Sequence, residues 1–290
     1  MKALSAQGII EVKALRSQGI AYKKIASILS LSPATVLKYS KSVRLNNEAK
    51  QLLLNNELKN QKKFCGEYSQ EKDFRVPKLD EDFANLLGHL FFDGSVCTCN
   101  GKFILAFTNA SKTAVDNFVS LLWKCMGLRA GKIYLIKGVN VDYYQVECYS
   151  KKAYMFLSSI SSSFSTTDNI GVPAEIFNAN DSIKASFLRA FWDDEGCISH
   201  AGTLSGVSKS EKMIRDLVLL QERLGIASWA RTTIREDGPI HLIVVAKNKP
   251  NFARFMYKIG FEHAIVTKGY HIGKAKKDLL LEKFIEAYHN

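Results

Sequence analysis

The sequence has 290 residues, 47% of them hydrophobic, which is enough to bury a sizeable core in two or three units. Its formal net charge of +12 favours a polyanion, most simply nucleic acid, as the partner, with a basic surface kept for solubility as the alternative. No apolar run approaches the ~18 residues of a membrane helix, and the first residues lack the apolar stretch of a signal peptide. We therefore expect a soluble, cytoplasmic protein without membrane contact.

The excess positive charge is concentrated near the start of the chain. Residues 1–60 contain ten Lys and Arg against three Asp and Glu. Apolar residues at helical spacing predict a first helix that stops near Gln18–Gly19 and a short second helix around Ile25. Ser32–Pro33, an N-cap followed by a proline at the first helical position, predicts a third helix. Residues 1–45 are therefore predicted to form a small all-α domain.

The predicted third helix has the composition of a DNA recognition helix. Small or hydroxylated side chains at its N-terminal end, namely Ser32, Ala34 and Thr35, would allow a close approach to base edges. Lys38 and Tyr39 would reach phosphates. The pattern resembles the helix-turn-helix of resolvases and sigma factors. A three-helix module that binds another protein would show the same apolar spacing, so that interpretation stays open.

Two similar stretches, LLGHLFFDG and LRAFWDDEG, lie about a hundred residues apart in the rest of the chain. Each is predicted to be an apolar helix that contains a small residue and ends in an acid followed by a glycine. The two acids are Asp93 and Glu195. We expect the glycines that follow them, Gly94 and Gly196, to supply a left-handed turn that ends each helix.

The elements after each motif also repeat. A hairpin, a helix, two more strand-like runs and an aromatic helix follow in both halves. The repeat predicts an α+β fold with two αββαββα units, residues 79–165 and 182–290, related by a pseudo-twofold axis within a monomer. Residues 46–78 are predicted to be a partly helical connector, and residues 166–181 a linker between the units.

The small residues inside the two motif helices indicate how the helices meet. Gly88 and Ala190 would let them pack closely, at a cost in helix propensity of up to about 1 kcal/mol for glycine. Asp93 and Glu195 would then lie side by side, each at the negative end of its own helix. A divalent cation resolves both conflicts. In a protein that binds DNA, two acids that hold Mg²⁺ predict phosphodiester hydrolysis.

These motifs resemble those of the LAGLIDADG homing endonucleases in their single-chain, two-motif form, over roughly residues 79–285. Gly88 and Ala190 match the family's small position at the helix interface, and Asp93 and Glu195 match its metal-binding catalytic acids. The resemblance implies that the two four-stranded antiparallel sheets form a saddle in the major groove of double-stranded DNA.

Family members commonly carry a basic residue near the end of each unit, which supports the attacking water or the transition state. Lys268 stands where the resemblance places this residue in the second unit, so it is a third catalytic candidate. The equivalent stretch of the first unit, SFSTTDNIGVP, has no lysine. Cleavage of one strand could therefore be slow or absent.

Each predicted sheet should turn one polar face toward DNA, because side chains alternate along a strand. The second unit offers Arg231, Thr233 and Arg235 on one face of a strand. The candidates in the first unit are Lys102, Thr108, Lys132 and Lys137, with Tyr143 and Gln145.

Three polar residues of the motifs have simpler interpretations. Asp193 and Asp194, which precede Glu195, are expected to be either solvated or helix-end residues rather than further metal ligands. His89 is expected to be a packed or hydrogen-bonded histidine within its helix rather than a ligand.

Three functions are compatible with these patterns. The first is a site-specific, Mg²⁺-dependent DNA endonuclease, which the presence of both acids favours. The second is a transcription regulator that uses an endonuclease-like fold to bind DNA, which the missing lysine and the added helix-turn-helix favour. The third is an intron maturase, in which the same fold binds structured RNA.

Overall fold

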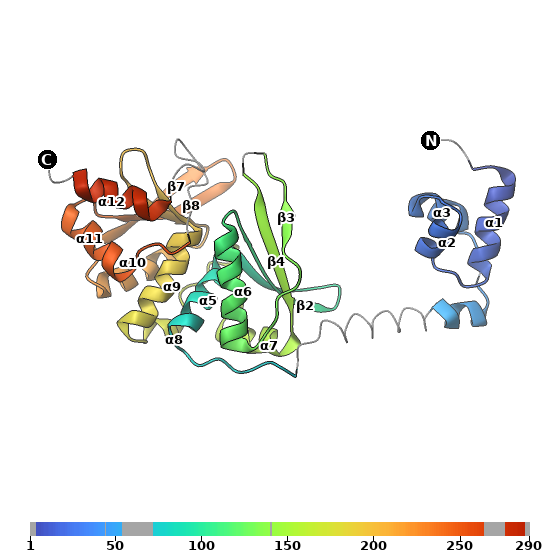
Figure 1. Ribbon diagram of the computed structural model, residues 1–290, viewed down its shortest axis with the longest axis horizontal. Helices are drawn as coiled ribbons and strands as arrows, with labels where there is room; N and C mark the ends of the chain where they lie inside the picture. The colour runs from blue at the N-terminus through green and yellow to red at the C-terminus, as the bar shows by residue number, and fades with distance from the viewer. Residues whose placement is uncertain (1–3, 44, 54–71, 140, 264–275, 288–290) are drawn as a thin grey trace. The chain divides into compact units, whose positions relative to one another are not determined.

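A computed structural model provides the structure of the protein (Figure 1). It describes residues 4–43, 45–53, 72–139, 141–263 and 276–287. The contacts divide the chain into two units, Met1–Ser69 and Gln70–Asn290, called the N-terminal and the C-terminal unit below. None of the helices in the described part of the chain combines the length and apolarity that crossing a membrane requires.

The described part of the N-terminal unit contains the short helices α1 (Ala6–Ser17), α2 (Tyr22–Ile28) and α3 (Pro33–Ser40), and residues 47–53 are also helical. Ser32 begins α3 as predicted, because its side chain accepts a hydrogen bond from the backbone N of Thr35 at 3.1 Å. Gly19, at the predicted stop of α1, adopts a φ of 79°. The small core of this unit consists of Val12, Ile25, Ala26 and Val36.

The C-terminal unit contains the predicted repeat. The elements of its first half are α5 (Glu81–Phe91), β1 (Gly94–Cys99), β2 (Lys102–Asn109), α6 (Lys112–Met126), β3 (Tyr134–Ile136), β4 (Tyr143–Tyr149) and α7 (Lys151–Ile160). The short helices η1 (Thr166–Asp168) and α8 (Ala174–Phe177) follow. The elements of the second half are α9 (Asp181–Asp194), β5 (Gly196–Ile198), β6 (Leu204–Ser208), α10 (Glu211–Arg223), β7 (Ser228–Arg235), β8 (Gly238–Val245) and α11 (Lys249–Lys258).

The two halves share one topology, which confirms the predicted α+β fold. Their antiparallel sheets have the orders β1-β2-β4-β3 and β5-β6-β8-β7, which are the same order in each half. Helices cover one face of each sheet, and the residues between sheets and helices form a single apolar core. A last helix, α12 (Lys277–Ala287), has no counterpart in the first half.

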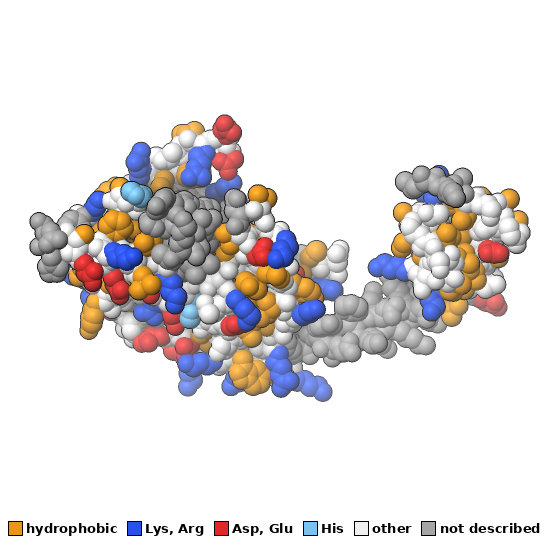
Figure 2. Space-filling model, turned by 45° about the horizontal axis from the view of Figure 1, so that its top comes forward, with side chains coloured by type: hydrophobic (Ala, Val, Ile, Leu, Met, Phe, Trp, Pro, Cys, Tyr) orange, Lys and Arg blue, Asp and Glu red, His pale blue; other side chains and the backbone are white. Residues whose placement is uncertain are grey.

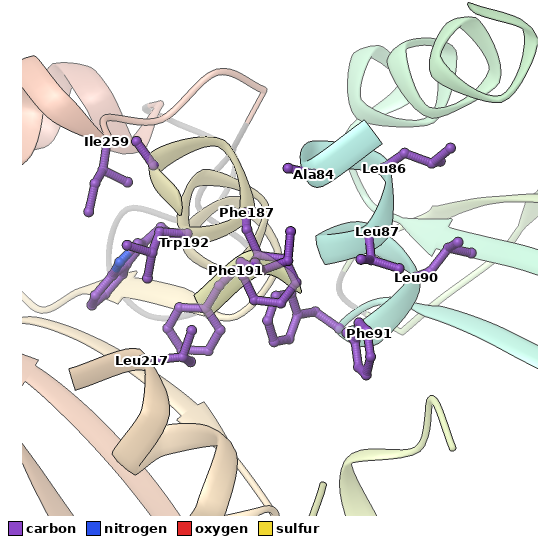
Figure 3. Packing of buried hydrophobic residues seen from close by; sticks show 14 of the residues in the cluster. Ala84, Leu86, Leu87, Leu90, Phe91, Phe187, Phe191, Trp192, Leu217 and Ile259 are labelled. Carbon is purple, nitrogen blue, oxygen red and sulfur yellow. The ribbon is translucent and has the colours of Figure 1, made fainter. Parts of the chain in front are cut away.

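The two motif helices, α5 and α9, pack against each other at the centre of the C-terminal unit (Figure 1). In Figure 3, Phe187 of α9 points toward α5, where its ring centroid lies 6.1 Å from that of Phe91, whereas Trp192 points away into the core of the second half. Gly88 lies directly against Ala190: a Cβ on Gly88 would lie 2.6 Å from the Cβ of Ala190. Only a residue without a side chain permits this approach.

The role expected for Gly94 and Gly196 is wrong in its detail. Neither glycine has a positive φ, and each is the first residue of a strand. Glycine is needed there because the strand leaves the helix at close range. A Cβ on Gly94 would lie 2.6 Å from the carbonyl O of His89, and one on Gly196 would lie 2.3 Å from the carbonyl O of Trp192.

A β-branched residue at the contact between the two helices should destabilise the fold. In Gly88→Val the new side chain overlaps Ala190, so we expect the free energy of unfolding to fall by about 2 kcal/mol or more. Ser120→Val, on the exposed side of α6, is the control, and its effect should stay within about 0.5 kcal/mol. Urea unfolding measures both, and equal effects would contradict the close contact.

Candidate metal centre and nucleic-acid interface

The C-terminal ends of α5 and α9 open onto one pocket of about 430 Å³. Its acidic lining comes from both halves of the repeat: Asp93 follows α5, and Asp193, Asp194 and Glu195 end α9. The structure therefore brings together the two acids that the sequence analysis paired. The remaining lining residues are Phe92, Thr108, Asn109, Ala110, Tyr143 and Lys277.

Asp93 is held by β2, the second strand of the hairpin that follows it. Its Oδ2 accepts a hydrogen bond from Nδ2 of Asn109 at 2.7 Å, and its carbonyl O accepts one from the backbone N of Thr108 at 3.3 Å. Burial raises the pKa of the Asp93 carboxyl well above its ordinary value, and the neighbouring Asp194 and Glu195 raise it further. The groups around Asp93 therefore offset only part of the negative charge of its carboxylate.

Glu195 is the residue that ends α9. Its backbone N donates to the carbonyl O of Phe191 at 2.8 Å, and the residue lines the pocket as a partly buried group. Glu195 also contributes to raising the pKa of both Asp93 and Asp194, so the three carboxyl groups interact.

Asp194 is a helix-end residue, which is one of the two expected alternatives, but it is not solvated. Its side chain is fully buried, and its Oδ2 lies 2.9 Å from Nδ1 of His89, whose side chain is also fully buried. His89 is therefore hydrogen-bonded inside its helix, as expected. Burial lowers the pKa of His89 to about 4, so the imidazole is neutral at neutral pH. Asp194 is not solvated because the tight approach of α5 and α9 covers the last turn of α9.

Asp193 is also buried rather than solvated. Its Oδ1 and Oδ2 accept hydrogen bonds from the backbone N of Glu262, at 3.0 and 3.3 Å. Burial raises the pKa of its carboxyl group. Asp193 therefore ties the end of α9 to the segment that follows α11, and it does not face solvent.

Lys277 is a functional candidate that the sequence analysis missed. Its side chain is buried, and its Nζ donates to the carbonyl O of Asp193 at 2.8 Å and to that of Trp192 at 3.2 Å. Burial lowers the pKa of this lysine. Its ammonium group thus caps the C-terminal end of α9, where a cation is favourable, and reduces the repulsion among the acids.

A signal for Lys277 was present in the sequence. The apolar stretch DLLLEKFIEA predicts a helix, and Lys277 stands at its first position, where the helix dipole disfavours a cation. A charge that the dipole of its own helix disfavours indicates a partner on another element, as it does for the acids at the end of α9. Lys268, by contrast, lies outside the described residues.

The pocket alone supplies only part of the ligand shell that a divalent cation such as Mg²⁺ needs. Asp93 and Glu195 supply two carboxylates with uncompensated charge, which is the donor type that Mg²⁺ prefers. Within the described ranges, no three His, Cys, Asp or Glu side chains converge as a complete metal site. Mg²⁺ normally takes one or two carboxylates and completes its shell with water and substrate phosphates. The residues present therefore fit a metal that is bound together with a phosphodiester.

The outer faces of the two sheets, turned away from the helices, carry the predicted DNA contacts of the C-terminal unit. Arg231, Thr233 and Arg235 alternate on one face of the edge strand β7, and both arginines are exposed. Lys102 and Thr108 lie on the outer face of β2, whereas the buried Leu105 lies on the opposite face, toward the helices.

Two other predicted contacts of the first half lie beside β3 rather than within it. Lys132 precedes this strand, and Lys137 follows it and forms an ion pair with Asp142 at 2.7 Å. On the face seen in Figure 2, Lys and Arg side chains are interspersed with Asp and Glu rather than gathered in one continuous patch.

Four of the five predicted contacts of the helix-turn-helix lie on α3, and the fifth, Ser32, is its N-cap. Ser32, Ala34 and Lys38 are exposed, whereas Thr35 and Tyr39 are half-buried. The Ser32 and Thr35 hydroxyl groups lie 2.8 Å apart and hydrogen-bond each other, and Tyr39 packs on the core of the unit. The roles of these residues on DNA stay predictions.

Two family models match the chain. Residues 182–260 match the model described as LAGLIDADG-like domain, and residues 2–43 match the helix-turn-helix domain of resolvase. The LAGLIDADG-like match thus covers most of the second half of the repeat. The first half of the repeat lies outside the matched residues, and its sheet has the same strand order as the sheet of the second half.

The chain is also similar to several curated proteins. It is 24% identical over 276 residues to a DNA polymerase of Thermococcus sp. strain GE8, a match that covers 90% of this chain and 14% of the polymerase. It is 30% identical over 185 residues to a glutamine–fructose-6-phosphate aminotransferase of Methanocaldococcus jannaschii, covering 62% of this chain and 16% of that protein. The chain thus spans less than a fifth of these relatives.

Solved structures with a similar arrangement include the homing endonuclease I-DmoI. A mesophilic variant of that protein matches with a TM-score of 0.49 and 17% identity, over 63% of this chain and 96% of the other. Full-length DUF199/WhiA from Thermatoga maritima matches with a TM-score of 0.48 and 14% identity, over 73% of this chain and 61% of the other.

The raised pKa of Asp93 predicts a pH-dependent stability difference. The ordinary pKa of an Asp carboxyl group is 3.8. The stability that protonated Asp93 contributes to the folded state is therefore lost as the pH rises from 3.8 through the raised pKa. Asp93→Asn removes this loss. Its free energy of unfolding in EDTA should exceed that of the wild type by a margin that grows with pH, at up to about 1.4 kcal/mol per pH unit, before it levels off.

Urea unfolding at a series of pH values measures this margin. Mg²⁺ should reduce it by stabilising the wild type alone. Asp116→Asn, which removes an exposed partner of Lys112, is the matched control and should change little. A margin that does not depend on pH would show that Asp93 is not held in an uncompensated state.

Proposed function

We propose that the chain is a site-specific DNA endonuclease of homing type, which hydrolyses phosphodiester bonds of double-stranded DNA with Mg²⁺. The observation that carries the proposal is the meeting of Asp93 and Glu195 at one pocket between two sheets of the same topology. A protein that only binds DNA gains no stability from burying acids that repel each other.

The two sheets support the proposed substrate. Each can present its outer face to a major groove, and the pseudo-twofold relation of the halves suits a duplex, whose two strands run in opposite directions. Both acids come from one chain, so the proposed site is complete in a monomer. The helix-turn-helix would add contacts outside the region that the sheets cover.

The chain's own residues have distinct tasks in the proposed reaction. When bound, Mg²⁺ would activate water and stabilise the negative charge of the leaving oxygen. Asp93 and Glu195 would hold it, and Asn109 would fix the orientation of the Asp93 carboxylate. Lys277 would offset the charge of the acids while it stays bonded to the end of α9.

A regulator that binds DNA without cutting it is the second candidate. The observation that favours it is the inequality of the halves: Lys277 supports the end of α9, whereas a residue with an amide, Asn109, contacts Asp93 in the first half. The match to a resolvase helix-turn-helix also suits a regulator. Single-strand nicking is the intermediate outcome between the two candidates.

Cleavage of a randomised duplex library decides between them. The full chain with Mg²⁺ should cut a long target in both strands, and Asp93→Asn and Glu195→Gln should each slow cutting by at least about 100-fold. Asp116→Asn is the matched control for loss of an acid and should cut like the wild type. Binding without cutting above the level of the two variants would contradict the endonuclease and support the regulator.

A further inference from the structure

One buried hydrogen-bond network joins the two halves beneath the proposed metal centre. Oδ2 of Asp194, on α9, lies 2.9 Å from Nδ1 of His89, on α5. The same carboxyl group accepts from Nδ2 of Asn109 through Oδ1 at 3.4 Å and from the backbone N of Asp93 through Oδ2 at 3.5 Å. Asn109 in turn donates to Oδ2 of Asp93 at 2.7 Å. A residue of the second half thus contacts the metal-binding acid of the first half directly and through Asn109.

The position of Asp194 argues against a role as a metal ligand. Its side chain and that of His89 are both 0% exposed, so water and a phosphodiester have no access to the carboxylate. Its oxygens already face His89, Asn109 and the backbone of Asp93. As whole residues, Asp93, Asp194 and Glu195 are all partly exposed and line the pocket, and it is the side chain of Asp194 that is fully buried.

The first half shows that the fold does not need an acid at this place. The residue that corresponds to Asp194 in the first motif is Phe92, which is also buried and packs against Phe187 and Phe191. An apolar residue is usually cheaper to bury than a carboxyl group, even one that is hydrogen-bonded. The acid in the second half therefore has a task other than packing.

We propose that Asp194, supported by His89, is a positioning residue that orients Asp93 for metal binding. The inference rests on the proposed function, because it concerns the metal-binding acid of that site. His89 fixes the Asp194 carboxyl group through Nδ1, and Asp194 fixes the side-chain amide of Asn109 and the backbone of Asp93. Groups that orient metal ligands in this way typically change metal affinity by about 10- to 100-fold when they are removed.

Binding of Mn²⁺ alone to the full chain, measured by the electron paramagnetic resonance of the free ion, tests this role. Asp194→Leu should weaken Mn²⁺ binding by about 10-fold or more. His89→Leu should weaken it by a similar factor, and the double variant should lose no more than either single variant, because both act through one network. Asp93→Asn provides the reference for loss of a ligand.

Stability separates positioning from a structural role. Asp194→Leu should unfold at the same or a higher urea concentration than the wild type, since it replaces a buried acid with an apolar side chain like that of Phe92. A variant that loses stability but keeps its Mn²⁺ affinity within twofold would overturn the proposal. A large loss in Asp194→Leu with none in His89→Leu would make Asp194 a ligand and would also overturn it.

Hydrogen exchange of the Asn109 side-chain amide, followed by NMR without metal, gives an independent measurement. Exchange should become at least about 10-fold faster in Asp194→Leu, because the amide loses one of its acceptors. Wild-type Mn²⁺ binding that does not depend on Asp93 would contradict the proposed function, and the positioning role with it. Binding that depends on Asp93 but not on Asp194 or His89 would leave the proposed function standing and overturn the positioning role alone.

Discussion

The close contact of α5 and α9 is the constraint on which the rest of the C-terminal unit depends. Gly88 has no side chain, and Ala190 has only a methyl group, so the two helices approach until a further carbon atom would overlap. Their C-terminal ends then lie at one pocket, and the acids there are brought together against their mutual repulsion. The free energy for this arrangement comes from the apolar core that both helices share, which includes Leu87, Phe91 and Phe187.

A residue from outside the two helices offsets part of the negative charge of the acids at this pocket. Lys277, at the start of α12, neutralises part of the negative charge and occupies the last carbonyl groups of α9. His89, on α5, and Asn109, on β2, hydrogen-bond to the acids as neutral groups. Asp93 and Glu195 line the pocket as partly exposed residues. This distribution suits a cation that arrives with a phosphodiester and leaves with the products.

The sequence was sufficient to predict the architecture because the repeat constrains it twice. Two motifs with the same small residue and the same acid–glycine end indicate a helix pair, and the same order of elements after each motif indicates two like sheets. The burial of Asp193 and Asp194 could not be predicted in this way. A run of three acids at a helix end is usually solvated, and its burial depends on how tightly a partner helix covers the last turn.

Lys277 shows a second limit of the sequence. It lies 82 positions after Glu195, and only the fold brings its ammonium group to the end of α9. The same holds for Asn109, which is an ordinary strand-end residue until the register of β2 places it beside Asp93. Residues that repeat in both motifs could be found from the pattern, whereas Asn109 and the contact that Lys277 makes with the end of α9 could not.

Localised cleavage of the protein backbone by bound iron tests the central claim most directly. Fe²⁺ with ascorbate and peroxide produces hydroxyl radicals at the metal, and these cut the chain nearby. If the ends of α5 and α9 share one divalent-metal centre, the full chain should be cut at two places, near Asp93 and near Glu195. Excess Mg²⁺ should suppress both cuts, and Asp93→Asn should lose both together. Cuts at only one of the two places, or a cut near Glu195 that persists in Asp93→Asn, would contradict a shared centre.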